Sequence, residues 1–186
     1  MTEAASVEAH EEMIGTSASI RAVFDLIRKV AQTDIPALIS GETGTGKELT
    51  ARAIHECSQR KQGPFVPINC GAIPETLLES ELFGHERGAF TGAIQQKKGK
   101  VEAAAGGTLF LDEIGDLRPS LQVKPLRFPQ DGTFERIGYH QTLHVHARMT
   151  AATNVDLKAA IDSNLIRVDL YYRLGVMHIH LPPLRE

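Results

Sequence analysis

The chain of 186 residues has the size of one domain and is long enough to bury a core of its own. Hydrophobic residues make up 42% of it and charged residues 23%, which is the composition of an ordinary soluble globular protein. The formal charge of −3 excludes an overall basic field for nucleic acid, and no apolar run is long enough to span a bilayer. The start of the chain lacks the residue order of a signal peptide, and Cys57 and Cys70 make no disulfide framework, so we expect a cytoplasmic protein with no membrane association.

The first predicted elements are a polar segment and an amphipathic helix. Residues 1–13 are polar and aperiodic, which indicates a linker or tail ahead of a domain over residues 14–186. Apolar residues then recur at helical spacing between Ile20 and Ala31, and Pro36 ends that helix.

Short apolar runs and amphipathic stretches alternate along the rest of the chain. Strands are predicted at residues 37–39, 65–68, 108–111 and, with a weaker pattern, 149–152. A helix that begins near Pro74 is expected to bury three leucines, Leu77, Leu78 and Leu82. Residues 84–99 are glycine-rich and indicate an inserted loop. Strands that alternate with helices predict an α/β fold with a mostly parallel sheet covered on both faces.

A glycine-rich turn follows the first predicted strand and leads into a helix from about Lys47. It consists of Gly41, Glu42, Thr43, Gly44, Thr45, Gly46, Lys47 and Glu48, which satisfy the P-loop pattern G-x-x-x-x-G-K. Glycines let backbone N–H groups turn toward phosphate oxygens, and the helix N-terminus adds unsatisfied donors. Lys47 is therefore expected to reach the β- and γ-phosphates of a nucleotide. Glu48 stands where a Ser or Thr commonly meets magnesium, and a turn that binds nothing is the alternative interpretation.

A second predicted strand end carries two carboxylates. The run from Gly106 to Leu111 ends in Asp112 and Glu113. Because ligands of open α/β sheets gather at the carboxyl ends of strands, Asp112 is placed to hold magnesium and Glu113 to orient or deprotonate an attacking water. The alternative is that both acids only cap the following turn.

Three polar residues later in the chain have two interpretations each. Asn154, with Thr153, ends a predicted strand, where its side chain either senses a γ-phosphate or forms an Asx turn. Arg167 and Arg173 either reach the γ-phosphate of a neighbouring subunit or are solvated surface residues. Local pattern alone does not choose between these interpretations.

Two histidine pairs have the i, i+2 spacing that places side chains on one face of a strand. They are His144 with His146 and His178 with His180. This spacing is compatible with a zinc site, but no carboxylate or cysteine stands at ligand spacing beside either pair. Histidines that line ordinary strands are the preferred interpretation.

The glycine-rich insertion contains the motif GAFTGA, formed by Gly88, Ala89, Phe90, Thr91, Gly92 and Ala93. On this motif the chain resembles the AAA+ ATPase domain of bacterial sigma-54-dependent transcription activators, the enhancer-binding proteins. Agreement with that family is also present at the P-loop, the acidic strand end and residues 79–86, 151–154, 169–174 and 181–186. The resemblance covers residues 14–186 and implies a P-loop NTPase fold, the AAA+ large subdomain, with a mostly parallel sheet sandwiched by helices.

The resemblance also implies roles at the nucleotide. The P-loop binds ATP, Asp112 holds Mg²⁺ and Glu113 activates water. Asn69 matches the residue that restrains the catalytic glutamate according to nucleotide state, and Asn154 matches the residue called sensor I. The family accepts Glu48 after the P-loop lysine.

Further implied roles concern partners. Arg167 and Arg173 match arginines that act on a neighbouring subunit, so active sites would form between subunits of a ring, usually a hexamer. The GAFTGA loop is implied to rise on ATP binding and push on sigma-54, which remodels sigma-54 RNA polymerase for promoter opening. Its glycines supply hinge freedom, and Phe90 and Thr91 present an apolar and a hydroxyl contact.

Some features depart from the family. Pro125 and Pro129 stand where leucines are usual, and they should break or shorten a helix near the second pore loop. The family continues into a helical lid and then a helix-turn-helix, so we expect both to be absent here and DNA to be contacted only through the absent domain. Two alternatives stay open: a truncated or decayed, non-catalytic nucleotide-binding fragment, and a different P-loop enzyme such as a small-molecule kinase.

Overall fold

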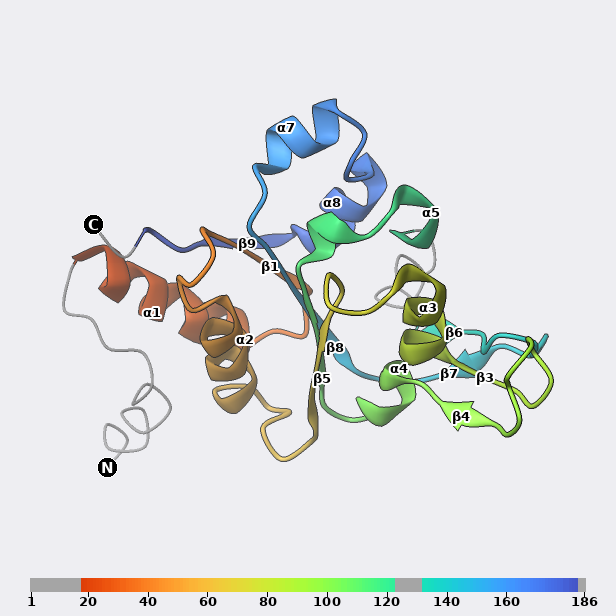
Figure 1. The fold of residues 1–186 in the computed structure, drawn as a ribbon. Helices are drawn as coiled ribbons and strands as arrows, with labels where there is room; N and C mark the ends of the chain where they lie inside the picture. The colour runs from red at the N-terminus through yellow and green to blue at the C-terminus, as the bar shows by residue number, and fades with distance from the viewer. Residues whose placement is uncertain (1–17, 123–131, 184–186) are drawn as a thin grey trace.

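The computed structural model describes residues 18–122 and 132–183, with a five-stranded sheet at its centre. The strands follow the order β2-β5-β8-β1-β9, and every neighbouring pair is parallel (Figure 1). Their bounds are β1 Ala37–Ser40, β2 Phe65–Asn69, β5 Thr108–Asp112, β8 Arg148–Thr153 and β9 Met177–His180. The α/β fold with a parallel sheet, predicted from the alternation of elements, is confirmed.

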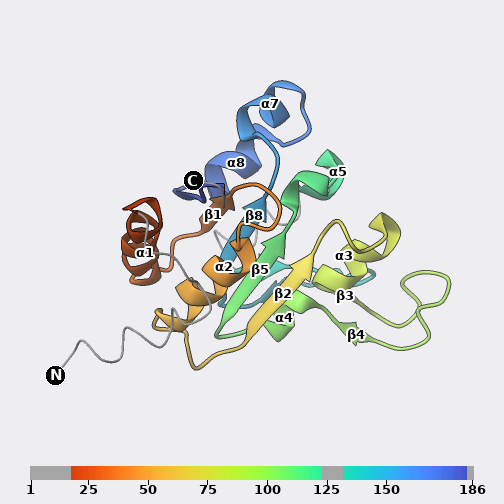
Figure 2. The ribbon, with the colours of Figure 1, turned by 60° about the vertical axis from the view of Figure 1, so that its left-hand side comes forward.

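Helices cover both faces of this sheet. The described helices are α1 Ala18–Ala31, α2 Lys47–Glu56, α3 Glu75–Phe83, α4 Lys100–Ala103, α5 Pro119–Gln122, α7 Leu157–Asp162, α8 Val168–Leu174 and the 3-10 turn Ile114–Asp116. Figure 1 shows α1 and α2 on one side of the sheet and α3 and α4 on the other. The turned view in Figure 2 keeps this division.

The hydrophobic core is split by the sheet into two layers. On β1, Ala37 and Ile39 face α1 and α2, whereas Leu38 packs in the opposite layer with Leu170 and Leu174 of α8. Successive strand residues point to opposite faces, so a strand covered on both sides is apolar without interruption. Both layers therefore hold the sheet rigid where its carboxyl edge carries the site described below.

Two short antiparallel ribbons lie off the main sheet. Strands β3 (Gly84–His85) and β4 (Lys97–Lys98) pair at the base of the predicted inserted loop. Strands β6 (Thr133–Phe134) and β7 (Leu143–His144) form the second ribbon. An isolated bridge between His85 and Ile137 joins the two ribbons, so the inserted loop and the second hairpin form one projection.

One prediction about an element needs correction, and the strand predicted from the weaker pattern is confirmed. Leu77 is 48% exposed, because Leu78 and Leu82 are four residues apart on the buried side of α3 and Leu77 points to the side. The strand with the weak pattern, β8, is fully buried between β5 and β1. Its pattern is weak because buried polar residues interrupt it, among them Arg148, whose guanidinium donates a 2.9 Å hydrogen bond to the Val30 carbonyl.

Other predictions fall outside the described residues. These are the linker at residues 1–13 and the helix-breaking effect of Pro125 and Pro129. Across residues 18–122 and 132–183, no helix has the length and apolar character that a membrane crossing needs.

Candidate functional site

The parallel register brings one polar residue from each strand to the carboxyl edge of the sheet. Asn69 of β2 is the partner of Asp112 at the end of β5. Ser40 of β1 is the partner of Thr153 on β8 and of His180 on β9. Since ligands of open α/β sheets bind at this edge, the predicted nucleotide residues are gathered where such a ligand is expected.

The P-loop connects β1 to α2 at this edge. Gly44 and Gly46 have φ values of 84° and 88°, in the left-handed region that favours glycine. Gly46 is the N-cap of α2, so the helix begins directly at Lys47 and its unsatisfied N–H groups border the loop. The Thr45 hydroxyl donates a 2.8 Å hydrogen bond to the Glu42 carbonyl, which tightens the turn. These are the backbone features that the predicted phosphate cradle requires.

The two charged residues at the start of α2 point in different directions. Lys47 is only 9% exposed, and its Nζ donates hydrogen bonds of 3.0 Å and 2.8 Å to the carbonyls of Gly41 and Glu42. Its ammonium is thus held against the loop. Glu48 instead pairs with Arg52 one turn along the helix, at 3.1 Å.

The acidic strand end lies beside the P-loop lysine. Asp112 Oδ1 accepts a 2.9 Å hydrogen bond from the Glu113 backbone N–H. Burial raises the pKa of Asp112 above its ordinary value, and the Glu113 charge adds to this rise, while the hydrogen bond and the Lys47 charge oppose it. Glu113 has φ 53° and ψ 48°, a left-handed conformation that is costly for a non-glycine residue and is found mainly where function demands it.

Asn69 closes a turn next to the Glu113 carboxylate. Its Oδ1 accepts hydrogen bonds from the backbone N–H groups of Gly71, at 2.9 Å, and Ala72, at 3.0 Å. A Cβ added at Gly71 would lie 2.7 Å from Glu113 Oε2, so the absence of a side chain there leaves room for that carboxylate. Asn69 and Glu113 are therefore both placed around Gly71.

Asn154 reaches the P-loop. Its Nδ2 donates to the Thr43 hydroxyl at 3.3 Å. The backbone turn at this strand end is held by the Thr153 hydroxyl, which accepts from the Val155 N–H at 3.3 Å. The structure thus connects the end of β8 directly with the loop after β1.

The two candidate arginines lie at the two ends of α8, Arg167 as its N-cap and Arg173 within its last turn. Arg167 precedes the helix, and its guanidinium donates to both oxygens of Asp169, at 3.0 Å and 2.9 Å. This pairing raises the pKa of Arg167 and lowers that of Asp169. Arg173 lies in the last turn of the same helix. The Arg167 guanidinium is thus engaged within its own helix.

The GAFTGA loop is a closed turn at the tip of the β3–β4 ribbon. The Gly88 N–H donates a 2.8 Å hydrogen bond to the Ala93 carbonyl, and Gly88 and Gly92 have φ values of 80° and 103°. Phe90 is 40% exposed, because its ring packs edge-on against His85 with the centroids 4.9 Å apart. The Phe90 side chain is thus partly covered at the tip.

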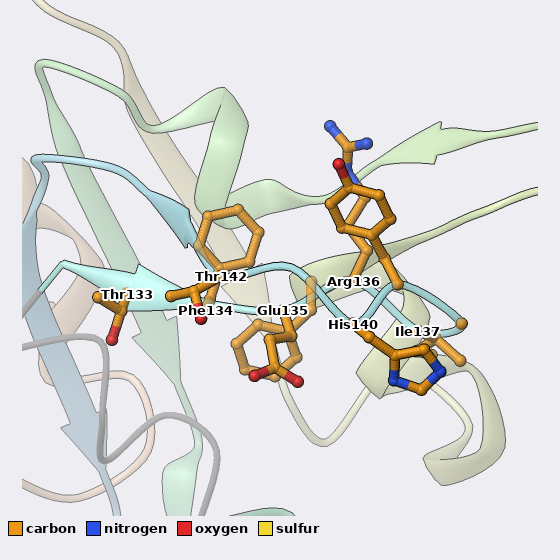
Figure 3. Close-up of a pocket in the computed structure, with 10 residues that line it drawn as sticks. Thr133, Phe134, Glu135, Arg136, Ile137, His140 and Thr142 are labelled. Atoms are coloured by element: carbon orange, nitrogen blue, oxygen red, sulfur yellow. The ribbon is translucent and has the colours of Figure 1, made fainter.

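An ion-pair network ties this loop to the second hairpin. Arg136 is 11% exposed and donates 2.7 Å hydrogen bonds to Glu86 and, through two nitrogens, to Glu102. The Glu102 carboxylate is the main cause that raises the pKa of Arg136. Figure 3 shows Arg136 and Glu135 pointing to opposite sides of the hairpin strand.

This hairpin also borders a cavity of about 460 Å³, lined by Phe83, Phe134, Ile137 and Tyr139 among others. Sequence reasoning missed the link between the two loops, because Glu86, Glu102 and Arg136 are far apart in the chain. Alternating charge on short segments is too common to single them out.

The zinc interpretation of the histidine pairs gains no third protein ligand. Over the part of the chain that the structure describes, no group of three or more His, Cys, Asp or Glu side chains is arranged to hold a metal. The free thiols of Cys57 and Cys70 are half-buried and buried. Burial raises the pKa of Cys70 to about 12, so that thiol stays protonated near neutral pH.

A comparison with known protein families finds a match: the sequence pattern of the family called the sigma-54 interaction domain matches residues 13–180 of the chain. The match covers most of the sequence, and the chain belongs to this family of AAA+ P-loop NTPase domains. The Nif-specific regulatory protein of Azotobacter vinelandii is 58% identical over 174 residues, which are 94% of this chain and 33% of that protein. The chain spans about a third of the length of the curated relatives it matches.

Solved structures agree with this assignment. The crystal structure of NtrX from Brucella abortus matches with a TM-score of 0.85 and 38% identity, over 96% of this chain and 40% of that one. A crystal structure of the same NtrX in complex with ATP matches with a TM-score of 0.84 and 39% identity, over 93% of this chain and 39% of that one. The AAA+ fold predicted from the resemblance is thereby confirmed.

Proposed function

We propose that this domain binds and hydrolyses ATP and uses the energy to remodel sigma-54 RNA polymerase for promoter opening. The observation that carries the proposal is the convergence of Lys47, Asp112 and Asn154 on the P-loop edge of the sheet, beside Glu113. The projection formed by the β3–β4 and β6–β7 ribbons belongs to the same domain. A domain that uses ATP hydrolysis to remodel a partner requires such a contact surface. We place this activity in the cytoplasm.

The described residues fit a nucleoside triphosphate. Phosphates need backbone N–H donors and positive charge. The left-handed glycines and the N-terminus of α2 supply the donors, and the buried Lys47 ammonium supplies the charge. A Mg²⁺–phosphate complex needs carboxylate oxygens for the metal and a cation for the phosphate. Asp112, Glu113 and Lys47 provide these groups. The ATP complex of NtrX adds support from a relative with the same fold.

In the proposed reaction, Asp112 would hold Mg²⁺ and Glu113 would take the proton of the attacking water. When bound, Mg²⁺ would neutralise charge that develops on the phosphate oxygens. Desolvation strengthens Coulomb interactions at Asp112, so its partly buried position favours cation binding. Asn69 would restrain Glu113 through the turn at Gly71, and Asn154 would report the state of the P-loop through Thr43.

We further propose that Arg167 and Arg173 serve the ATP site of a neighbouring copy in a ring, usually a hexamer. A guanidinium can stabilise the charge that builds up during phosphoryl transfer. Arg167 would have to leave Asp169 in order to do so. Because both side chains of that pair are more than 40% exposed, the exchange would cost little.

The sigma-54 contact is assigned to the tip formed by Gly88, Ala89, Phe90, Thr91, Gly92 and Ala93. The closed turn presents Thr91 and the part-covered Phe90 at the end of the ribbon.

A pull-down of sigma-54 in the presence of an ATP transition-state mimic tests this function. The wild-type chain should retain sigma-54, whereas Thr91→Ala should lose most of it because the hydroxyl contact is gone. Equal retention by both proteins would count against the proposal. Labelled ATP that binds without phosphate release, unchanged by Glu113→Gln, would instead indicate a non-catalytic fragment. Phosphoryl transfer to an added acceptor would indicate a kinase.

A further inference from the structure

A glutamine side chain is fully buried between the segment that follows Glu113 and the start of α8. Gln122 belongs to α5 and is 0% exposed. Its Nε2 donates hydrogen bonds of 2.7 Å to the carbonyls of Leu117 and Leu165, and its Oε1 accepts one of 2.8 Å from the Arg167 N–H. Backbone groups thus occupy both donor hydrogens and the oxygen of this amide.

These three hydrogen bonds fix the orientation of the Gln122 amide. A backbone carbonyl only accepts and a backbone N–H only donates, so exchanging the amide oxygen and nitrogen would break all three bonds. Buried polar groups are costly to leave without partners. The amide therefore holds the three backbone groups in one arrangement.

One end of this bridge is the turn that begins at Glu113. The Asp116 N–H donates to the Glu113 carbonyl at 3.0 Å. The Leu117 N–H donates to the Ile114 carbonyl at 3.2 Å, so that Leu117 closes the turn. A displacement of Glu113 would therefore be carried along a short, hydrogen-bonded turn to the carbonyl that Gln122 binds.

The other end of the bridge is the N-terminus of α8. Arg167 is the N-cap of this helix, and its side chain is exposed. Leu170 and Leu174 anchor the body of α8 in the core, whereas the Gln122 amide holds the backbone of the N-cap. Because the backbone sets the direction in which a side chain leaves a helix, the amide also helps to aim Arg167.

We propose that Gln122 is a positioning residue that couples the ATP site of one copy to the arginine which that copy offers to its neighbour. The inference rests on the proposed function, in which Arg167 serves the ATP site of a neighbouring copy. A change at Glu113 that accompanies hydrolysis would shift the Leu117 carbonyl, and the amide would pass this shift to the Arg167 backbone. Hydrolysis in one site would thereby alter the help that the same copy gives to the next site.

Gln122→Met is the test variant, because methionine has a similar length and removes all three hydrogen bonds while filling the space. Ser58→Ala is the matched control. The buried Ser58 hydroxyl also joins two backbone groups, since it donates to the His55 carbonyl at 2.7 Å and accepts from the Arg60 N–H at 3.1 Å. It follows the C-terminal end of α2, away from both ends of the Gln122 bridge.

The first measurement needs no ATP. Hydrogen exchange of the Arg167 backbone N–H, followed by NMR, should be at least about tenfold faster in Gln122→Met than in the wild type, and unchanged in Ser58→Ala. Thermal unfolding would verify that both variants are folded, and Gln122→Leu replaces Gln122→Met if the latter does not fold. An unchanged exchange rate at Arg167 would overturn the proposal.

The second measurement is phosphate release by mixed chains. Gln122→Met alone should release phosphate at least about tenfold more slowly than the wild type or Ser58→Ala, because a misplaced catalytic group is far less effective. Addition of Glu113→Gln, which lacks turnover but keeps Gln122, should raise the rate at least about threefold, since its Arg167 can serve the Gln122→Met site. The matched partner Glu113→Gln/Gln122→Met should not raise it.

The outcomes separate this inference from the proposed function. Full activity of Gln122→Met, or equal rescue by both partners, would overturn the inference. Rescue by neither partner would also overturn it, because Gln122 would then act within its own site. No phosphate release by the wild type at any protein concentration would instead count against the proposed function, and hydrogen exchange at Arg167 would still decide whether Gln122 positions that residue.

Discussion

The carboxyl edge of the main sheet and the projection formed by the β3–β4 and β6–β7 ribbons are built in contrasting ways. At the sheet edge, Asn69 and Asp112 hold their places because parallel register fixes the end of each strand. The projection has only two-residue strands, and its two ribbons are joined by Arg136 and an isolated bridge. One region is positioned by the five-stranded sheet, and the other by two short ribbons, a single backbone bridge and one ion-pair network.

This difference indicates which part can move. A sheet buried in two apolar layers resists displacement, whereas a ribbon held by ion pairs can be released when those pairs are broken. We therefore expect damage to the edge to stop chemistry without loosening the fold. Damage to the projection should loosen that part and spare nucleotide binding.

The largest expected effect is on turnover. Glu113→Gln keeps the shape of the side chain but removes the base, so phosphate release should fall by about 10²- to 10³-fold. Affinity for labelled ATP should change by less than about threefold, since the P-loop is intact. Glu56→Gln, at the exposed end of α2, is the matched control and should leave both values unchanged. Undiminished phosphate release by Glu113→Gln would remove this residue from the mechanism.

The next effect concerns the fold of the projection. Arg136→Ala leaves the carboxylates of Glu86 and Glu102 facing each other without their cation, so the midpoint of thermal unfolding should fall by about 5 °C. ATP affinity should change by less than about twofold. Arg118→Ala removes a highly exposed pair with Glu75 and should shift the midpoint very little. A collapse of ATP affinity in Arg136→Ala would show that the two regions are not separate.

A matched pair of glycine substitutions sharpens the comparison. Gly44 has φ 84° and Gly92 has φ 103°, and an added Cβ at either position meets no atom within 4 Å. Alanine would therefore act through backbone strain of about 1 kcal/mol at both sites. Gly44→Ala should weaken ATP binding by up to about tenfold, and Gly92→Ala should weaken only sigma-54 retention. Binding of ATP and of sigma-54 should be measured for both variants. Loss of sigma-54 retention in Gly44→Ala and of ATP binding in Gly92→Ala would contradict the assigned roles of the two loops.

The smallest expected effect is a gain in stability. The pKa of Asp112 is raised in the folded protein, so its ionised form destabilises the fold above that pKa. Asp112→Asn should raise the unfolding midpoint at pH 7 while phosphate release is lost. The gain should shrink as the pH falls through the folded pKa and vanish below the ordinary value of 3.8, where both states are protonated. Unfolding curves from pH 7 to pH 4 would measure this, and a gain that grows on acidification would contradict the assigned cause.

The elements that sequence reasoning predicted are those with local signals. The P-loop and the apolar run before Asp112 can each be identified from about ten consecutive residues. A parallel sheet then brings the ends of their strands to one edge. β8 was also predicted, but its sequence signal is weaker because Arg148 and Thr150 are buried polar residues in an otherwise apolar strand. Leu77 was placed on the wrong side of α3 because three leucines within six residues do not fix the helix orientation.

Long-range contacts were beyond sequence reasoning. The link of Arg136 to Glu86 and Glu102 and the convergence of His178 and His180 on Ser40 depend on segments brought together only by the fold. No pattern within a single segment encodes such pairs. The assigned role of Asn69 came from the resemblance alone, and the resemblance chose between the two interpretations of Arg167 and Arg173. These roles remain predictions.

The most direct test of the central claim is phosphate release per subunit across a series of protein concentrations, with Lys47→Ala as the control. If ATP is hydrolysed at sites completed by a neighbouring copy, the rate per subunit should rise with concentration and then level off. Lys47→Ala should release no phosphate at any concentration, because the ammonium held against Gly41 and Glu42 is lost. A rate per subunit that stays flat, or that is equal in Lys47→Ala, would contradict the account.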